Sequence, residues 1–242
     1  MGLDYVLPAA TSPDEHDRAA KVAVLPVGSF EQHGSHLPLA TDTLIACAIT
    51  RAIAGRYPVL ALPPVTVSCS HEHQAWAGTV SISATTLHAI VTDIWDSLRR
   101  SGISKLVIVS GHGGNYVLRN VVQEASVTGP DMAFYPAGGD WARARAAAGM
   151  VTSDHDDMHA GELETSILLH LSPEIVRDSY QLADHIAGKR DDLLTLGMAE
   201  YTTTGVIGRP SFATAAKGAA ALDSLANSFR HCLDALGTST PD

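Results

Sequence analysis

The chain has 242 residues, 45% of them hydrophobic and 17% charged, a composition typical of a globular protein with a sizeable core. The formal net charge is -10 and no run of Lys or Arg occurs, which argues against nucleic acid or an anionic membrane as a partner. The sequence contains neither a targeting signal nor an apolar stretch long enough to cross a bilayer. We therefore expect one cytoplasmic domain over residues 1–242.

Three cysteines, Cys47, Cys69 and Cys232, lie far apart in the sequence. Their odd number and wide spacing favour reduced thiols over a disulfide framework or a paired-cysteine metal site. This use of cysteine agrees with a cytoplasmic location.

Four short apolar runs rich in β-branched residues predict strands, at 21–27, 57–65, 105–111 and 131–137. Their hydrophobicity is continuous rather than alternating, which indicates burial on both faces of a parallel sheet. Helical spacing of apolar residues predicts helices at 42–56, 85–100 and 217–236, and a long loop is expected at 202–218. The predicted fold class is α/β, a three-layer α/β/α sandwich around a mainly parallel sheet.

Residues that can bind metal ions follow these strands, where ligands of parallel sheets usually bind. The first strand is followed by Glu31, His33, His36 and Asp42, and the third by the turn "GHGGN" at 111–115, which contains His112. A later segment at 157–166, which leads into a helix, contains His159, Glu162 and Glu164.

Imidazole nitrogen and carboxylate oxygen together suit Zn²⁺, Mn²⁺ or Fe²⁺, and ligands from separate strand ends are typical of a catalytic site. Glu31 and His33, two residues apart, point to one side of an extended chain and can each bind one of two adjacent ions. Asp42, at a helix start, can bridge both ions with its two oxygens. Such a pair of ions holds a hydroxide between them as a nucleophile.

The motifs "LPVGSFEQHGSHLPLATD", "GHGGN" and "HAGELETS" together resemble the creatininase family of metal-dependent amidohydrolases. The similarity spans nearly the whole chain, and the "EQHG…LP…TD" block is its most specific part. The resemblance implies a three-layer α/β/α sandwich, commonly assembled as a homohexamer, with two divalent ions in each chain. Zn²⁺ is the expected metal, with Mn²⁺ or Fe²⁺ as alternatives.

The resemblance also assigns residues by position. It implies a catalytic histidine at His159, which passes a proton to the leaving nitrogen, and a substrate contact at Ser70. The implied metal ligands are Glu31, His33, Asp42, His112 and Glu164.

The turn after His112 departs from the creatinine-hydrolysing members, which carry an aromatic residue and a glutamate where this chain has Gly113 and Gly114. Creatinine is therefore not the expected substrate. Glu162 is a candidate replacement for the missing glutamate, as a ligand or an acid–base group. Asn115 either orients substrate or caps the next helix, with capping favoured. The segment at 69–76, "SHEH" included, is interpreted as a substrate-facing loop outside the ligand set.

The sequence thus predicts a dinuclear metal-dependent amidohydrolase that cleaves a C–N bond in a cyclic amide, a formamide or a short peptide. The glycine-glycine-asparagine turn is similar to two other branches, formamide deformylases and the peptidase of mycofactocin maturation. A non-catalytic relative that binds a ligand in the same cleft is the alternative outside enzymes. The expected partners are a small-molecule or short-peptide amide substrate and further copies of the chain.

Overall fold

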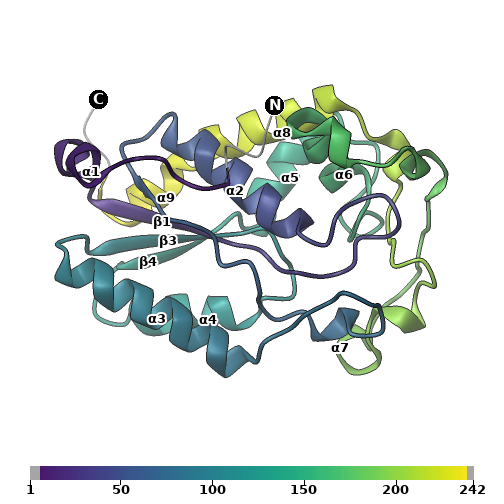
Figure 1. Cartoon of the computed structure of the whole chain (residues 1–242), viewed down its shortest axis with the longest axis horizontal. Helices are drawn as coiled ribbons and strands as arrows, with labels where there is room; N and C mark the ends of the chain where they lie inside the picture. Colours follow the sequence, from purple (N-terminus) through teal and green to yellow (C-terminus); the bar gives the residue numbers. More distant parts are fainter. Residues whose placement is uncertain (1–5, 239–242) are drawn as a thin grey trace.

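A computed structural model describes residues 6–238 and contains a four-stranded sheet in which all neighbouring strands are parallel (Figure 1). The strand order is β2 (Leu60–Ala61), β1 (Val22–Val27), β3 (Lys105–Ser110) and β4 (Met132–Tyr135). The prediction of a mainly parallel sheet is confirmed. The prediction of a single domain over 1–242 reaches beyond the described residues at both ends.

The second strand is much shorter than the predicted 57–65. Pro58, Pro63 and Pro64 lie on either side of its two paired residues, and proline has no backbone N–H to donate to a neighbouring strand. An isolated bridge between Val27 and Val65 continues the contact beyond those prolines.

Helices cover both faces of the sheet, which gives the predicted three layers (Figure 1). One face is covered by α2 (Thr41–Ala54), α5 (Gly138–Ala147), α6 (Glu162–Leu171), α8 (Ala215–Ser228) and α9 (Arg230–Ala235). The other is covered by α3 (Ala84–Arg100) and α4 (Val117–Ala125). Alternate β1 residues enter different cores: Val22 and Val24 face α2 and α8, whereas Ala23 and Leu25 face α3 and α4. This two-sided burial explains the continuous apolar run in the sequence.

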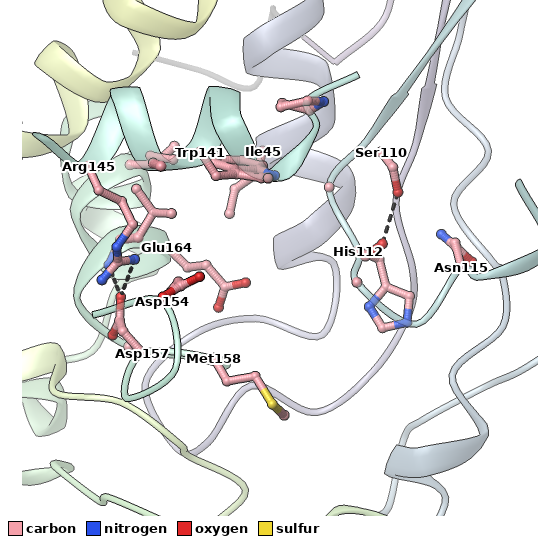
Figure 2. Close-up of a pocket in the computed structure, with 18 of the residues that line it drawn as sticks. Ile45, Ser110, His112, Asn115, Trp141, Arg145, Asp154, Asp157, Met158 and Glu164 are labelled. Atoms are coloured by element: carbon pink, nitrogen blue, oxygen red, sulfur yellow. Dashed lines mark hydrogen bonds and ion pairs between the residues drawn. The ribbon is translucent and has the colours of Figure 1, made fainter. Parts of the chain in front are cut away.

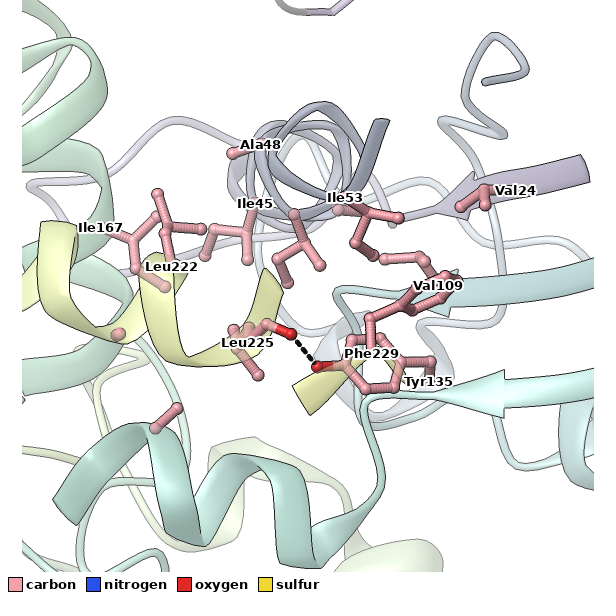
Figure 3. Close-up of a cluster of buried hydrophobic side chains, with 14 of the residues drawn as sticks. Val24, Ile45, Ala48, Ile53, Val109, Tyr135, Ile167, Leu222, Leu225 and Phe229 are labelled. Carbon is pink, nitrogen blue, oxygen red and sulfur yellow. Dashed lines mark hydrogen bonds between the residues drawn. The ribbon is translucent and has the colours of Figure 1, made fainter. Parts of the chain in front are cut away.

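The C-terminal segment differs from the single helix predicted over 217–236. It forms α8 and α9, which meet at Phe229, a fully buried residue whose ring packs edge-on against Tyr135 (Figure 3). The Tyr135 hydroxyl donates to the Leu225 carbonyl, which a continuous helix would pair with the Phe229 N–H. Helix α8 also begins inside the predicted loop, because the Thr214 side chain accepts a hydrogen bond from Lys217 N and caps it.

The remaining described elements are short and lie mostly in connections. They are the α-helices α1 (Ser12–Arg18) and α7 (Leu193–Leu196) and the 3₁₀ helices η1 (His71–His73), η2 (Pro173–Ile175), η3 (Asp178–Leu182), η4 (Met198–Glu200) and η5 (Pro210–Phe212). Within residues 6–238, no helix is both long and apolar enough to span a membrane. Cys47, Cys69 and Cys232 are buried and unpaired, as predicted.

Candidate metal centre

The predicted ligands meet at the carboxyl end of the sheet, between β1 and β3. Potential ligand atoms from Glu31, Asp42 and His112 lie within 4.8 Å of one another, and so do those from His33, Asp42 and Glu164. Asp42 belongs to both groups, which is the arrangement required of a residue that bridges two ions. A third group of the same size joins Glu31, His33 and His159.

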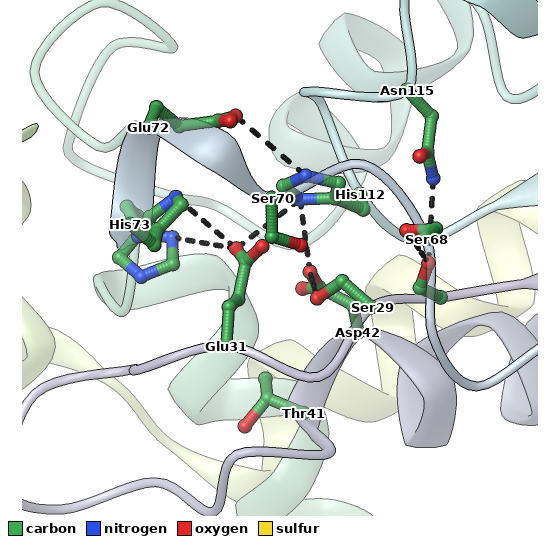
Figure 4. Close-up of polar contacts among 12 residues, drawn as sticks. Ser29, Glu31, Thr41, Asp42, Ser68, Ser70, Glu72, His73, His112 and Asn115 are labelled. Atoms are coloured by element: carbon green, nitrogen blue, oxygen red, sulfur yellow. Dashed lines mark hydrogen bonds and ion pairs between the residues drawn. The ribbon is translucent and has the colours of Figure 1, made fainter. Parts of the chain in front are cut away.

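The two oxygens of Asp42 face different histidines. Oδ2 lies 3.0 Å from His112 Nδ1, on the side of Glu31, and Oδ1 lies 3.0 Å from His33 Nε2, on the side of Glu164 (Figure 4 shows the first of these). The Ser29 hydroxyl donates to Oδ2 at 2.6 Å and helps to orient the carboxylate. Because Asp42 lies in the first turn of α2, the helix dipole also favours its negative charge.

Backbone carbonyls orient three of the histidines that face this cluster. Each ring donates one N–H to a carbonyl: His33 Nδ1 to Glu31 (3.1 Å), His112 Nε2 to Cys69 (2.8 Å) and His159 Nε2 to Gln32 (2.7 Å). A carbonyl can only accept, so the proton of each neutral ring lies on that nitrogen and the other nitrogen offers a lone pair to the cluster. This is the tautomer that a metal ligand requires.

Burial and close contacts shift the pKa values of the carboxyl and imidazole groups of the centre. Burial raises the pKa of Glu31, partly offset by His112, and no hydrogen bond of good geometry from the described residues reaches either of its oxygens. Burial opposes the charge of Asp42, yet the nearby His33 and His112 hold its pKa well below the usual range. Burial also opposes protonation of His33, but Asp42 and Glu164 raise its pKa to about 9. The donor set of imidazole nitrogens and carboxylate oxygens fits two divalent ions, whose charges would stabilise the ionised carboxylates.

The segment before α6 holds His159 and Glu164 in place. The Met158 and His159 N–H groups both donate to the Ile207 carbonyl at 2.9 Å. Ala160 adopts a left-handed conformation, φ 53°, and its N–H donates to Glu164 Oε2 at 2.6 Å. A left-handed alanine is strained, and here it directs the two flanking functional side chains toward one centre.

Burial changes the protonation of these two groups. It lowers the pKa of His159 well below the usual value, with help from the neighbouring His33 and His73. Burial raises the pKa of Glu164 to about 8, partly offset by His33. His159 is therefore a neutral ring with a free Nδ1, 3.8 Å from Glu31 Oε1.

Glu162 lies away from the centre. Its buried carboxylate pairs with Lys217 and accepts a hydrogen bond from Thr152 N at 3.0 Å. Hydrogen bonds from Lys217 and residue 152 lower its pKa, against the effect of burial. Although Glu162 was predicted as a possible ligand or acid–base group, these contacts remove it from the candidate set. Glu164 lies two residues further along the first turn of α6, and its carboxylate is the one that reaches the cluster.

The two predicted substrate contacts have different surroundings. Asn115 does not cap α4; its side chain accepts from Cys69 N at 3.2 Å and donates to the Gly28 carbonyl at 3.3 Å. Asn115 thus connects the loop after β3 with Gly28, which follows β1, and with Cys69. The favoured capping role was therefore wrong. Ser70 is fully buried next to the ligands, and its hydroxyl has no hydrogen-bond partner within residues 6–238. Its contact with substrate stays a prediction.

His73 lies beside the candidate ligands, in the segment 69–76 that the sequence predicted as a substrate-facing loop outside the ligand set. The ring is buried, its Nε2 lies 3.2 Å from Glu31 Oε1, and its centroid lies 4.4 Å from that of His159 (Figure 4). The neighbouring Glu72 lies 3.7 Å from His112 Nε2. The only sequence signal was the pair of histidines in "SHEH", because η1 has no periodic pattern that reveals which ring points inward.

Two cavities open beside the ligands. The smaller, about 130 Å³, is lined by Glu72, His73, His112, His159 and Glu164 among others. The larger, about 310 Å³, also includes His112 and Glu164 and extends past Met158 to Trp141 and the Arg145–Asp157 ion pair (Figure 2). The centre is thus accessible to a ligand larger than water.

The comparisons with known proteins agree with this geometry. The family model for creatininase, described as creatinine amidohydrolase, matches residues 9–233. The mycofactocin precursor peptide peptidase of Mycobacterium ulcerans is 39% identical over 208 residues, covering 81% of this chain and 77% of that protein. The peptidase of the same name from Mycolicibacterium smegmatis is 32% identical, covering 98% and 92%. The creatinine amidohydrolase of Pseudomonas putida is 28% identical, covering 68% and 69%.

Solved structures show the same fold. A crystal structure of creatinine amidohydrolase superposes with a TM-score of 0.78 at 24% identity, covering 94% of this chain and 96% of that chain. A structure described as creatininase with Mn has a TM-score of 0.75 at 23% identity, covering 93% and 95%. The family match and these relatives identify a hydrolase that acts on C–N bonds, and its buried cluster is a candidate metal site. The chain belongs to the creatininase family, and it is distinct from creatininase itself.

Proposed function

We propose that this protein is a peptidase that hydrolyses an amide bond of a precursor peptide with two divalent metal ions. The observation that carries the proposal is the division of the two Asp42 oxygens between His112 and His33, each beside a further carboxylate. The peptide substrate is supported by the relatives named as precursor peptide peptidases, which are 32% and 39% identical, against 28% for the creatinine amidohydrolase.

The proposed ligands of the first ion are Glu31, Asp42 and His112, and those of the second are His33, Asp42 and Glu164. When bound, the ions would polarise a substrate carbonyl and lower the pKa of water to near neutrality. Their identity is proposed as Zn²⁺ or Mn²⁺, because the donors mix imidazole with carboxylate and a solved relative is described with Mn.

His159 is the proposed acid–base residue. Its Nε2–H is held by the Gln32 carbonyl, so only Nδ1 can accept a proton and then donate it to the leaving nitrogen. Burial lowers its pKa, so the ring is neutral at neutral pH. His159 is buried and lines the smaller cavity, where a substrate amide could reach its Nδ1.

The larger cavity supports a substrate longer than a small ring. Its lining includes the apolar side chains of Ile45, Phe134 and Trp141, together with Arg119 and Arg145. A peptide could place one side chain on this wall while its scissile amide lies at His112 and Glu164. Gly113 lines both cavities, and a Cβ atom there would have no neighbour within 4 Å, whereas the space beside Gly114 is filled by Glu72 and His112.

The test is hydrolysis by protein reconstituted with Zn²⁺ or Mn²⁺, followed by mass spectrometry of the products. Short peptides, formamides and creatinine are compared under the same conditions. Peptide cleavage that disappears in Asp42→Ala supports the proposal. Cleavage of formamides or creatinine in preference to peptides would contradict the substrate. Full metal occupancy without turnover of any amide would favour the non-catalytic alternative, a ligand-binding relative of the same fold.

The homohexamer remains a proposal that rests on the resemblance to the family, and light scattering of the purified chain tests it. The cytoplasmic location is likewise an expectation from the sequence.

A further inference from the structure

His73 is bonded differently from the other histidines of the centre. Whereas His33, His112 and His159 each donate to a backbone carbonyl, the Nδ1 atom of His73 lies 2.9 Å from the side-chain nitrogen of Gln32. An amide nitrogen can only donate, so His73 Nδ1 must accept. The proton of the neutral His73 ring is therefore on Nε2, the nitrogen that faces Glu31.

The orientation of the Gln32 amide is determined by its surroundings. Its Oε1 accepts the Gly34 N–H at 2.9 Å, and its Nε2 donates to the Gly205 carbonyl at 3.1 Å as well as to His73. Both hydrogens of the amide nitrogen are thus used. The 3.2 Å approach of His159 Nε2 is not a further hydrogen bond, because that ring nitrogen already donates to the Gln32 carbonyl.

The backbone makes room for this amide. Gln32 is buried, and a Cβ atom at residue 205 would lie 1.8 Å from its Oε1. Gly205 and Gly34 both have positive φ angles, 85° and 64°, which a residue with a side chain rarely adopts. Two loops that are distant in the sequence therefore close around one side chain.

The consequence concerns Glu31. His73 Nε2 lies 3.2 Å from Glu31 Oε1, and among the described residues no hydrogen bond of good geometry reaches either Glu31 oxygen. We propose that Gln32 is a positioning residue that keeps His73 as an N–H donor, so that His73 orients the Glu31 carboxylate instead of binding an ion. This inference rests on the proposed function, in which Glu31 is a ligand.

The tautomers can be read directly by NMR. The full chain is labelled with ¹⁵N-histidine and loaded with diamagnetic Zn²⁺, and the His73 signals are assigned by their loss in His73→Gln. In the wild-type protein we expect a proton on Nε2 and a bare Nδ1 in both His73 and His159, and the opposite arrangement in His33. A proton on His73 Nδ1, or a signal that shows His73 bound to Zn²⁺, would overturn the inference.

Substitution of Gln32 tests its part in this arrangement. In Gln32→Glu a carboxylate faces His73 Nδ1 and can only accept, so the proton should move to Nδ1. In Gln32→Met neither tautomer is held, and a mixture is expected. The His159 tautomer should not change in either variant, because it depends on the backbone carbonyl of residue 32. Gln74→Glu is the matched control, since it adds the same charge at an exposed position beside η1. An unchanged His73 tautomer in both Gln32 variants would contradict the role of Gln32.

Metal affinity provides a second readout that a purely structural role would not change. The partners that orient a metal ligand contribute about 10–100-fold in affinity or activity. Where titration resolves two Zn²⁺-binding steps, Gln32→Glu should lower the affinity of the weaker step by this factor. Gln74→Glu should leave the affinity of that step unchanged. Equal affinities in the two variants would contradict the inference. If the tautomers are as expected but no amide is cleaved, the proposed function fails while the assignment of His73 stands.

Discussion

Asp157 should be the main anchor of the segment that presents His159 and Glu164. Its side chain is about 1% exposed, and it forms an ion pair with Arg145 at 2.9 Å. It also accepts hydrogen bonds from the first N–H groups of α6, those of Glu162 and, at 3.0 Å, Leu163. Asp157→Ala removes all three contacts and leaves the Arg145 guanidinium buried without a carboxylate.

The expected loss in the free energy of unfolding is about 3–5 kcal/mol, the usual cost of breaking a buried ion pair by removing one partner. For a chain of this length each 1 kcal/mol lowers Tm by about 2–4 °C, so Tm should fall by about 6–20 °C. Asp157→Asn keeps one oxygen for the helix N–H groups and should lose less.

Thermal and urea unfolding at matched metal loading measure these effects. Asp154→Ala, in the same loop but exposed, is the control and should change stability by less than about 0.5 kcal/mol. If Asp157→Ala were as stable as Asp154→Ala, the reasoning from the buried ion pair and the helix cap would be refuted.

Three further predictions concern the centre and the core. Elemental analysis should find about two divalent ions per chain. Asp42→Ala should lose both ions and His33→Ala mainly one, because only Asp42 is proposed to contact both. Equal losses in the two variants would argue against a bridging Asp42. His159→Ala should keep its metal but lose about 10²–10⁴-fold in turnover. Glu164→Gln should lose metal as well as turnover, because an amide is a weaker ligand for a divalent cation. Metal loss in His159→Ala would show that His159 is a ligand. Ile49→Ala should cost about 2–5 kcal/mol in urea unfolding, because Ile49 is fully buried between the sheet and α8; a loss below 1 kcal/mol would mean that this core is loosely packed.

Much of the fold could be predicted from local pattern. The continuous apolar run at β1 indicated burial on both faces, and Val22 and Ala23 do enter opposite cores. The helix predicted at 85–100 also depends on local pattern, and α3 begins there with Ser83 as its cap, whose hydroxyl accepts from Thr86 N. The break at Phe229 was not, because it depends on the Tyr135 hydroxyl, which comes from a strand far away in the sequence.

The identity of the candidate ligands likewise came from the sequence, since carboxylates and histidines gather after strands and the ends of parallel strands meet at one edge. Spacing alone could not separate Glu162 from Glu164. That choice depends on Lys217, a residue of another helix that takes the Glu162 carboxylate away from the centre.

The role of each histidine was decided only by tertiary structure. His33, His112, His159 and His73 are the same residue type in the sequence, yet three donate to carbonyls and the fourth accepts from Gln32. Which ring nitrogen carries the proton depends on the partner at the opposite nitrogen, and those partners come from separate loops. The sequence by itself therefore determined which groups are present for metal binding and proton transfer, and only the packing of those loops determined which of them present a lone pair and which an N–H.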